Sequence, residues 1–192
     1  MLAERDLFEF ARDKIALVSF FSIFYIVVYF ASKEIGLANA IKTSGAIIYL
    51  PAGVRLLACL IGRFWGGLGI FVATCFVVAP NVFPNESCGF HFAIAFINTS
   101  SVLISVLITL KLFKISEDLS NLRFIHLPFI DLIATFSQAF CYYLFLYFVE
   151  HIEEAELLPK FISQMTGNFL GGMVFMLTLL LLLNLRMKNT SK

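Results

Sequence analysis

Two charged side chains stand inside apolar stretches of this sequence, where an isolated charge is costly. Arg55 lies in the run at 44–61 and Asp131 lies in the run at 128–149. Ionisable groups in such surroundings either mark a functional site or pair with each other, because neither is solvated by water there. We predict that Arg55 and Asp131 form a buried ion pair. The alternative is that Arg55 extends its aliphatic stem toward lipid headgroups.

Amides and one tyrosine form a second polar group, placed mostly toward the opposite ends of the apolar runs. Its members are Tyr49, Asn81, Asn98, Gln138 and Asn168. Amides carry both donors and acceptors, so in an outward-facing pocket they can orient a small-molecule ligand. Amides inside a helix bundle also bond across to a neighbouring helix, which is a packing role. Both interpretations stay open, and the first makes these five the candidate ligand-binding residues.

Motifs for catalysis or metal binding are absent from the sequence. There is no HExxH, no G-x-S-x-G, no phosphate-binding loop and no C-x-x-C, and the three histidines and four cysteines are scattered. We therefore predict a protein that is not an enzyme and has no cofactor and no metal site. A net charge of +1 gives no reason to expect a nucleic-acid partner.

Six apolar runs must position these groups, at 15–31, 44–61, 64–83, 92–113, 128–149 and 167–185. About 20 apolar residues cross a hydrocarbon core of roughly 30 Å as a helix, which satisfies its own backbone hydrogen bonds. The sequence is 60% hydrophobic and 14% charged, against about 45–50% and 25% for soluble domains. We predict an all-α bundle of six transmembrane helices at 15–185. An amphipathic segment on the membrane surface (1–14) precedes it and a short tail (186–192) follows.

Lysines and arginines near or beyond the ends of the runs predict the orientation, since they concentrate on the cytoplasmic side. With a cytoplasmic N-terminus, ten of them are cytoplasmic and three lie opposite. The ten are Arg5, Arg12, Lys14, Arg63, Lys111, Lys114, Arg123, Arg186, Lys188 and Lys192, and the three are Lys33, Lys42 and Lys160. The acidic segment 150–164, which we predict to be a loop, then faces outward. We predict a multi-pass protein of a bacterial inner membrane with both termini cytoplasmic.

Proline and glycine residues indicate where the helices bend or approach closely. Pro51 removes a backbone donor inside the second run, so we expect a kink there. Gly53 lies beside it, and Gly167 and Gly171 have the small-residue spacing typical of helix–helix contact in membranes.

Four short segments occur in an order that resembles one known family. They are YLPAGVRLLA at 49–58 continuing into GRFWGG at 62–67, INTSS at 97–101, DLSNLR at 118–123, and TGNFLGG at 166–172. Together they are similar to the MASE1 family of bacterial membrane-associated sensor domains, over most of 44–185. The family usually has more spans and a C-terminal signalling enzyme, and it has a small or apolar residue where Arg55 stands. The resemblance implies a stand-alone sensor module that signals through a partner membrane or cytoplasmic protein.

Two other classes fit six short helices. One is the substrate-binding S-component of energy-coupling factor vitamin transporters, but the first run is rich in Phe, Ile, Val and Tyr rather than the small residues that mediate docking in that family. The other is an accessory subunit of a larger membrane complex, which the 23 phenylalanines would suit. We favour a non-catalytic sensor-type module that contacts membrane lipids, a partner protein and a small-molecule ligand.

Overall fold

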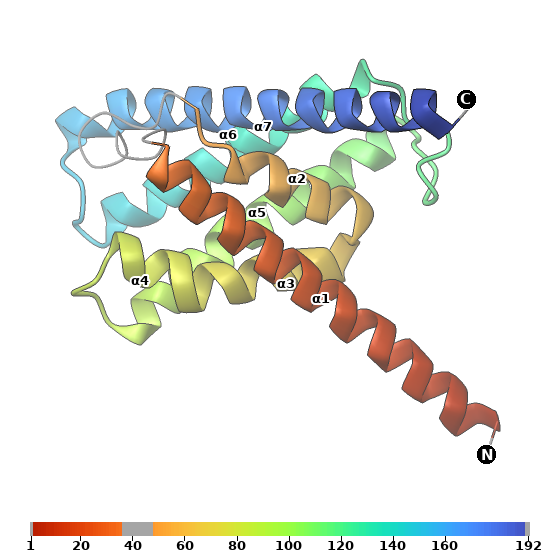
Figure 1. Cartoon of the computed structure of the whole chain (residues 1–192). Coiled ribbons are helices and arrows are strands. Elements are labelled where there is room, and N and C mark those ends of the chain that lie inside the picture. Colours follow the sequence, from red (N-terminus) through yellow and green to blue (C-terminus); the bar gives the residue numbers. More distant parts are fainter. Residues whose placement is uncertain (1, 36–47, 191–192) are drawn as a thin grey trace.

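Helices account for most of the chain in the computed structural model, which describes residues 2–35 and 48–190 and the side chains of 9–35 and 48–182. Figure 1 shows their arrangement, and the described part contains no strand. The elements are α1 (Leu2–Glu34), α2 (Pro51–Ile61), α3 (Arg63–Ala73), the π-helical segment η2 (Thr74–Val78), α4 (Ala79–Val82), α5 (Cys88–Leu112), α6 (His126–Phe148) and α7 (Glu154–Thr190). The predicted all-α class is therefore confirmed for these residues.

Five helical stretches within the described residues are long and apolar enough to cross a membrane. They are Glu9–Glu34, Arg63–Val82, Cys88–Leu112, His126–Phe148 and Glu154–Leu182. The predicted second span, 44–61, gives only the 11-residue helix α2, and residues 44–47 lie outside the described part. At about 1.5 Å per residue α2 is about 16 Å long, roughly half of a hydrocarbon core. The described residues thus form five candidate spans and one short inner helix, as in a multi-pass membrane protein.

Helix α2 occupies the middle of the bundle and packs against α1, α3, α5, α6 and α7. All of its residues except Leu57 and Ile61 are buried. On one side Leu56 and Leu60 join an apolar cluster with α5 and α6, and on the other Val54 and Ala58 join a cluster with α1 and α3. A helix enclosed in this way does not need to reach both membrane surfaces, which is why a short helix suffices here.

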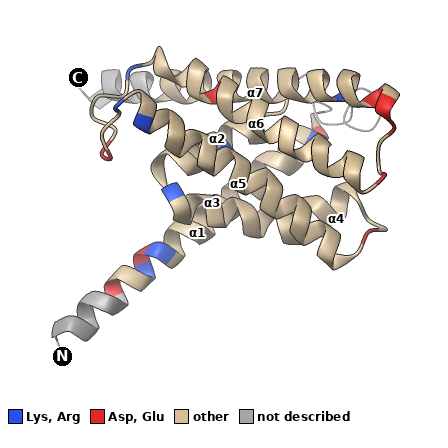
Figure 2. Cartoon of the chain, turned by 180° about the vertical axis from the view of Figure 1, so that it is seen from behind, with Lys and Arg blue, Asp and Glu red and all other residues tan. Residues whose placement is uncertain are grey.

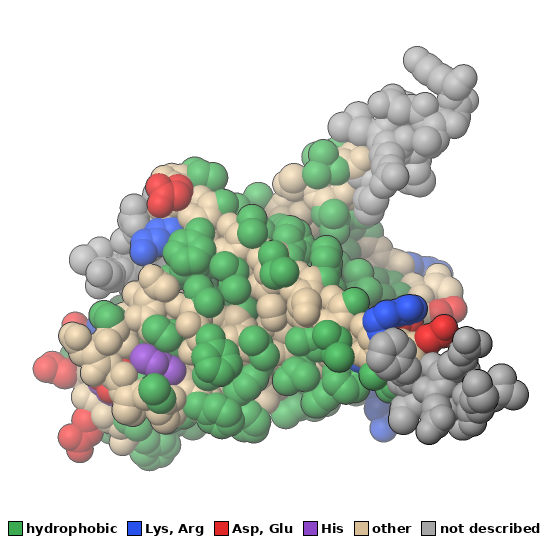
Figure 3. Space-filling model, turned by 60° about the horizontal axis from the view of Figure 1, so that its bottom comes forward, with side chains coloured by type: hydrophobic (Ala, Val, Ile, Leu, Met, Phe, Trp, Pro, Cys, Tyr) green, Lys and Arg blue, Asp and Glu red, His purple; other side chains and the backbone are tan. Residues whose placement is uncertain are grey.

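The outer faces of the surrounding helices are strongly apolar. Phe76, Phe96, Phe136 and Phe140 are among the many large hydrophobic side chains that are at least half exposed. Figure 3 shows such side chains spread over a face of the molecule between two charged ends. A continuous exposed apolar surface of this kind suits contact with lipid acyl chains.

Charged residues gather at the two ends of the bundle. Figure 2 shows basic residues of the first half of α1 near the end where both chain termini lie, and the acidic start of α7 at the other end. Glu150, Glu153 and Glu154 belong to that acidic end. Both termini thus lie at the same end of the bundle (Figure 1).

Three local expectations from the sequence differ from the structure. The segment 1–14 is not a separate surface helix, because α1 runs without a break from Leu2 to Glu34 and projects from the bundle (Figure 1). Pro51 does not kink a helix but begins α2, a position where its missing N–H has no intrahelical partner to lose. The segment 150–164 is loop only up to residue 153, since α7 begins at Glu154.

A π-helical turn at Thr74–Val78 interrupts the third apolar run. Pro80 follows it and cannot donate a backbone hydrogen bond, and the Asn81 amide donates to the Val77 carbonyl oxygen at 2.8 Å. Such π turns often occur at functional sites because they alter the direction of side chains on an otherwise regular helix. Both buried residues of this turn, Thr74 and Val78, face the cavity described next.

Candidate functional site

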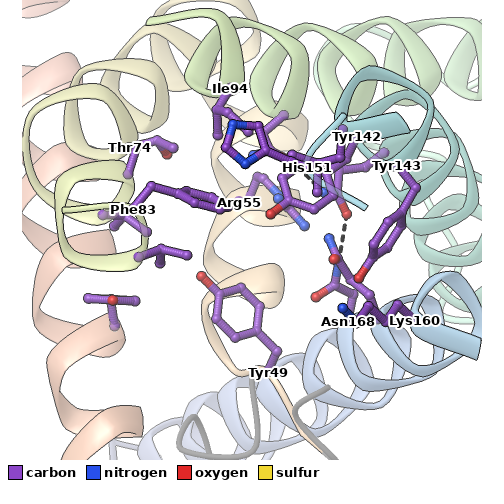
Figure 4. A pocket seen from close by; sticks show the side chains of 18 of the residues that line it. Tyr49, Arg55, Thr74, Phe83, Ile94, Tyr142, Tyr143, His151, Lys160 and Asn168 are labelled. Atoms are coloured by element: carbon purple, nitrogen blue, oxygen red, sulfur yellow. Dashed lines mark hydrogen bonds between the residues drawn. The ribbon is translucent and has the colours of Figure 1, made fainter. Parts of the chain in front are cut away.

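A cavity of about 320 Å³ lies between the helices, toward the acidic end of the bundle. Figure 4 shows its walls, in which side chains from α1, α2, α5, α6 and α7 converge. Its polar lining residues include Tyr25, Tyr29, Tyr49, Arg55, Thr74, Asn98, Gln138, Tyr142, Tyr143 and Asn168. A concave site with a few converging polar groups is the usual form of a small-molecule site.

Three amides in this wall form one hydrogen-bonded chain across three helices. Asn168 Nδ2 donates to Gln138 Oε1 at 2.7 Å, and Gln138 Nε2 donates to Asn98 Oδ1 at 2.5 Å. Gln138 is 1% exposed and Asn168 is 3% exposed. For the other atoms of the outer two amides, Asn98 Nδ2 and Asn168 Oδ1, no hydrogen bond is found within the described residues. The chain therefore joins α5, α6 and α7 and still leaves one donor and one acceptor beside the cavity.

Tyr49 lies in the turn that leads into α2, and α7 holds this turn in place. The Tyr49 N–H donates to the Gly167 carbonyl oxygen at 2.9 Å, and its hydroxyl is 3.3 Å from the Tyr25 hydroxyl. A Cβ atom at Gly171 would overlap the Tyr49 backbone. The predicted close contact at Gly167 and Gly171 is thus made with this turn, and it sets Tyr49 against the cavity (Figure 4).

Gly53 also permits close packing, as the sequence suggested. A Cβ atom there would overlap the Phe175 side chain of α7. The absence of a side chain at Gly53 therefore lets α7 approach the first turn of α2, two residues before Arg55.

Arg55 and Asp131 are both buried, at 4% and 1% exposure, but no ion pair or hydrogen bond joins them in the described part of the chain. Arg55 faces the cavity, whereas the Asp131 carboxylate packs against Gly172 of α7, where a Cβ atom would overlap it. Their charges still act on each other at longer range. The direct pair expected from the sequence is therefore not formed, and Arg55 does not extend to the lipid surface either.

Asn81 is the one candidate ligand residue that lies apart from the site. Its side chain is exposed and donates a hydrogen bond to the Val77 carbonyl oxygen of the π turn. Sequence reasoning missed the tyrosines of α1 and α6. Tyr25 and Tyr29 are four residues apart and so share one helix face, a signal that could have identified them.

Paired side chains surround the cavity mouth. His151 Nε2 lies 3.5 Å from Glu86 Oε1, and Lys160 Nζ lies 2.6 Å from Glu156 Oε2. His91 Nε2 is 2.8 Å from the Phe83 carbonyl oxygen, which fixes the α4–α5 loop. The His151–Glu86 contact joins the loop before α5 to the loop before α7, whereas the Lys160–Glu156 pair lies within α7.

The described residues contain no cluster of three or more His, Cys, Asp or Glu side chains that could hold a metal ion. Comparisons with protein-family models, with curated proteins and with solved structures find no match for this chain. The geometry of the cavity is therefore the basis for a functional proposal.

Proposed function

We propose that this chain is a non-catalytic membrane receptor for a small molecule, acting as the sensing part of a signalling assembly. The observation that carries the proposal is the amide chain from Asn168 through Gln138 to Asn98. A purely structural network would pair all of its atoms, because unpaired polar groups are costly in a membrane interior. This chain keeps a free donor and a free acceptor at the wall of a 320 Å³ cavity.

The signalling role rests on two further features. The segments at 49–67 and 166–172 resemble those of MASE1 sensor domains, and they contribute Tyr49, Arg55 and Asn168 to the cavity. Helix α2 contacts every neighbouring span and so couples the cavity to the whole bundle. Ligand binding would shift the packing of α2, and a partner membrane or cytoplasmic protein would respond to that shift. We propose that the chain crosses a bacterial inner membrane six times, with the short helix α2 in the second crossing and both termini cytoplasmic.

Gentle purification followed by mass spectrometry tests the receptor role. We expect the protein to retain a small molecule in stoichiometric amount. Asn98→Ala should reduce the retained amount by about tenfold or more, since one or two hydrogen bonds to the ligand are lost. Asn81→Ala is the matched control, because this amide lies outside the cavity, and it should retain the wild-type amount.

Two results would contradict the receptor role. One is an Asn98→Ala protein that retains as much ligand as wild type, which would make the amide chain a packing feature. The other is a protein that carries no small molecule but purifies within a stoichiometric larger complex, which would identify an accessory subunit.

The orientation can be tested with the native cysteines. Cys88 is exposed at the acidic end of the bundle, whereas Cys59 is buried. We expect a membrane-impermeant maleimide to label Cys88 in intact spheroplasts, because that end faces outward in the proposed topology. Cys88→Ser should remove this labelling. Labelling of Cys88 only after lysis would show that the orientation is the opposite of the proposed one.

A further inference from the structure

We infer that the ligand of this cavity is a small organic carboxylate whose anionic group pairs with Arg55. The inference rests on the proposed receptor function and specifies the chemical class of its ligand. It depends on the charge of the cavity wall, on the unpaired state of Arg55 and on the size of the cavity.

Arg55 is a buried cation without a direct partner. It is 4% exposed and lines the cavity, and no hydrogen bond or ion pair to its guanidinium is found within the described residues. A guanidinium has five N–H donors, and a buried charge without a counter-ion is strongly unfavourable. Figure 4 shows the side chain among the other lining residues, so an anion in the cavity would be within its reach.

No acidic side chain lines the cavity among the described residues. The segment 36–47, which lies outside them, has no Asp or Glu in its sequence. The two other basic residues of the lining, His151 and Lys160, lie beside Glu86 and Glu156 at the mouth. The unbalanced charge in the interior is therefore that of Arg55.

Asp131 is the one buried acidic side chain among the described residues, and therefore the internal counter-ion to consider. Its charge acts on Arg55, but its carboxylate is not part of the cavity lining and packs against Gly172. Its Oδ2 atom has no hydrogen-bond partner among the residues that the structure describes. Asp131 therefore moderates the positive potential without occupying the donors of Arg55, and these donors stay available to a ligand.

A carboxylate fits these donors better than a phosphate or sulfate does. One guanidinium neutralises one negative charge, and a carboxylate accepts its paired N–H donors in a planar bidentate arrangement. A volume of about 320 Å³ also leaves room for an organic body. The rings of Tyr25, Tyr29, Tyr49, Tyr142 and Tyr143 would contact that body, and the free amide atoms would bind a further polar group.

Matched acids and amides test the inference. The purified protein in lipid nanodiscs would be titrated with benzoate, 4-hydroxybenzoate, phenylacetate and octanoate, and with the uncharged amide of each. Thermal unfolding and calorimetry would give the affinities, and mass spectrometry would give the charge class of any co-purified molecule. We expect at least one acid to bind about tenfold or more tightly than its amide, and we expect octanoate to report whether an aliphatic, lipid-like body is accepted.

Variants of Arg55 connect this preference to one side chain. Arg55→Gln should remove the difference between acid and amide, and Arg55→Lys should keep the preference with weaker binding, because the ammonium retains the charge but lacks the planar fork. Circular dichroism and gel filtration would establish that both variants fold. If Arg55→Gln does not fold, the affinities of wild type and Arg55→Lys for the acids still test whether the guanidinium binds the carboxylate.

The outcomes separate this inference from the receptor function. Amides that bind as well as acids, or a co-purified molecule that is uncharged, would overturn the carboxylate class and leave the receptor intact. Acid binding that is unchanged in Arg55→Gln would also overturn it. If neither set binds and no small molecule co-purifies, the receptor function and the carboxylate inference both fail.

Discussion

Gly171→Ala should lower the free energy of unfolding by about 1–3 kcal/mol, the usual range for overpacking a tight interior. A Cβ atom there would overlap the backbone of Tyr49, and backbone atoms cannot rotate away as the end of a side chain can. The turn before α2 would have to move off α7, which would weaken the hydrogen bond from Tyr49 to Gly167. Unfolding by SDS in mixed micelles, followed by circular dichroism, would measure the effect.

The matched control is Gly89→Ala. Gly89 is exposed in the first turn of α5, and an added Cβ would meet only the Ser87 hydroxyl at an ordinary distance of 3.8 Å. We expect the free energy of unfolding of the Gly89→Ala protein to stay within about 0.5 kcal/mol of wild type. Equal effects of the two substitutions would mean that the close contact between α7 and the turn is not needed for stability.

Gln138→Leu should lower the free energy of unfolding by about 1–3 kcal/mol and abolish retention of the small molecule. Gln138 is the middle member of the amide chain, so its loss removes two hydrogen bonds and leaves Asn98 and Asn168 without these partners. Single hydrogen bonds between membrane helices contribute about 0.6 kcal/mol on average and up to about 1.7 kcal/mol. The same SDS titration, together with mass spectrometry of the purified variant, would measure both effects.

Asn81→Leu is the control for this amide-to-leucine change, because the Asn81 side chain bonds only within its own span and lies outside the cavity. Its retention of the small molecule should match wild type. The double variant Gln138→Leu/Asn168→Leu should recover part of the lost stability, since it removes an unpaired buried amide. A Gln138→Leu protein that matches wild type in both assays would rule out a role for the amide chain.

Hydrophobic pattern accounts for most of what could be predicted about the fold. The apolar runs correspond closely to Arg63–Val82, Cys88–Leu112 and His126–Phe148, because a segment that must satisfy its backbone bonds without water forms a helix whatever its neighbours are. The run at 44–61 gave a shorter helix than expected. Its apolar residues are buried by other helices rather than by lipid, and length rules for membrane spans do not apply to a helix enclosed in this way.

The candidate site was only partly predictable. The presence of costly polar groups inside apolar runs correctly drew attention to Asn98, Gln138 and Asn168, which meet in one hydrogen-bonded chain. The same argument predicted a pair between Arg55 and Asp131 and a place for Asn81 in the pocket, and the structure has neither. Depth along a helix can be estimated from the sequence, but the direction of a side chain around the helix axis cannot, and the π turn shifts that direction further near Asn81.

By itself the sequence determined the helical class, the approximate ends of most spans and the set of polar residues that need a partner. These properties follow from local chemistry, since each run must exclude water and each unpaired buried polar atom is costly. Only the tertiary structure decided that α2 lies at the centre, that Gly171 supports the Tyr49 turn and that Arg55 faces the cavity. Those facts depend on how helices rotate and pack against one another, which is set by contacts between residues far apart in the chain.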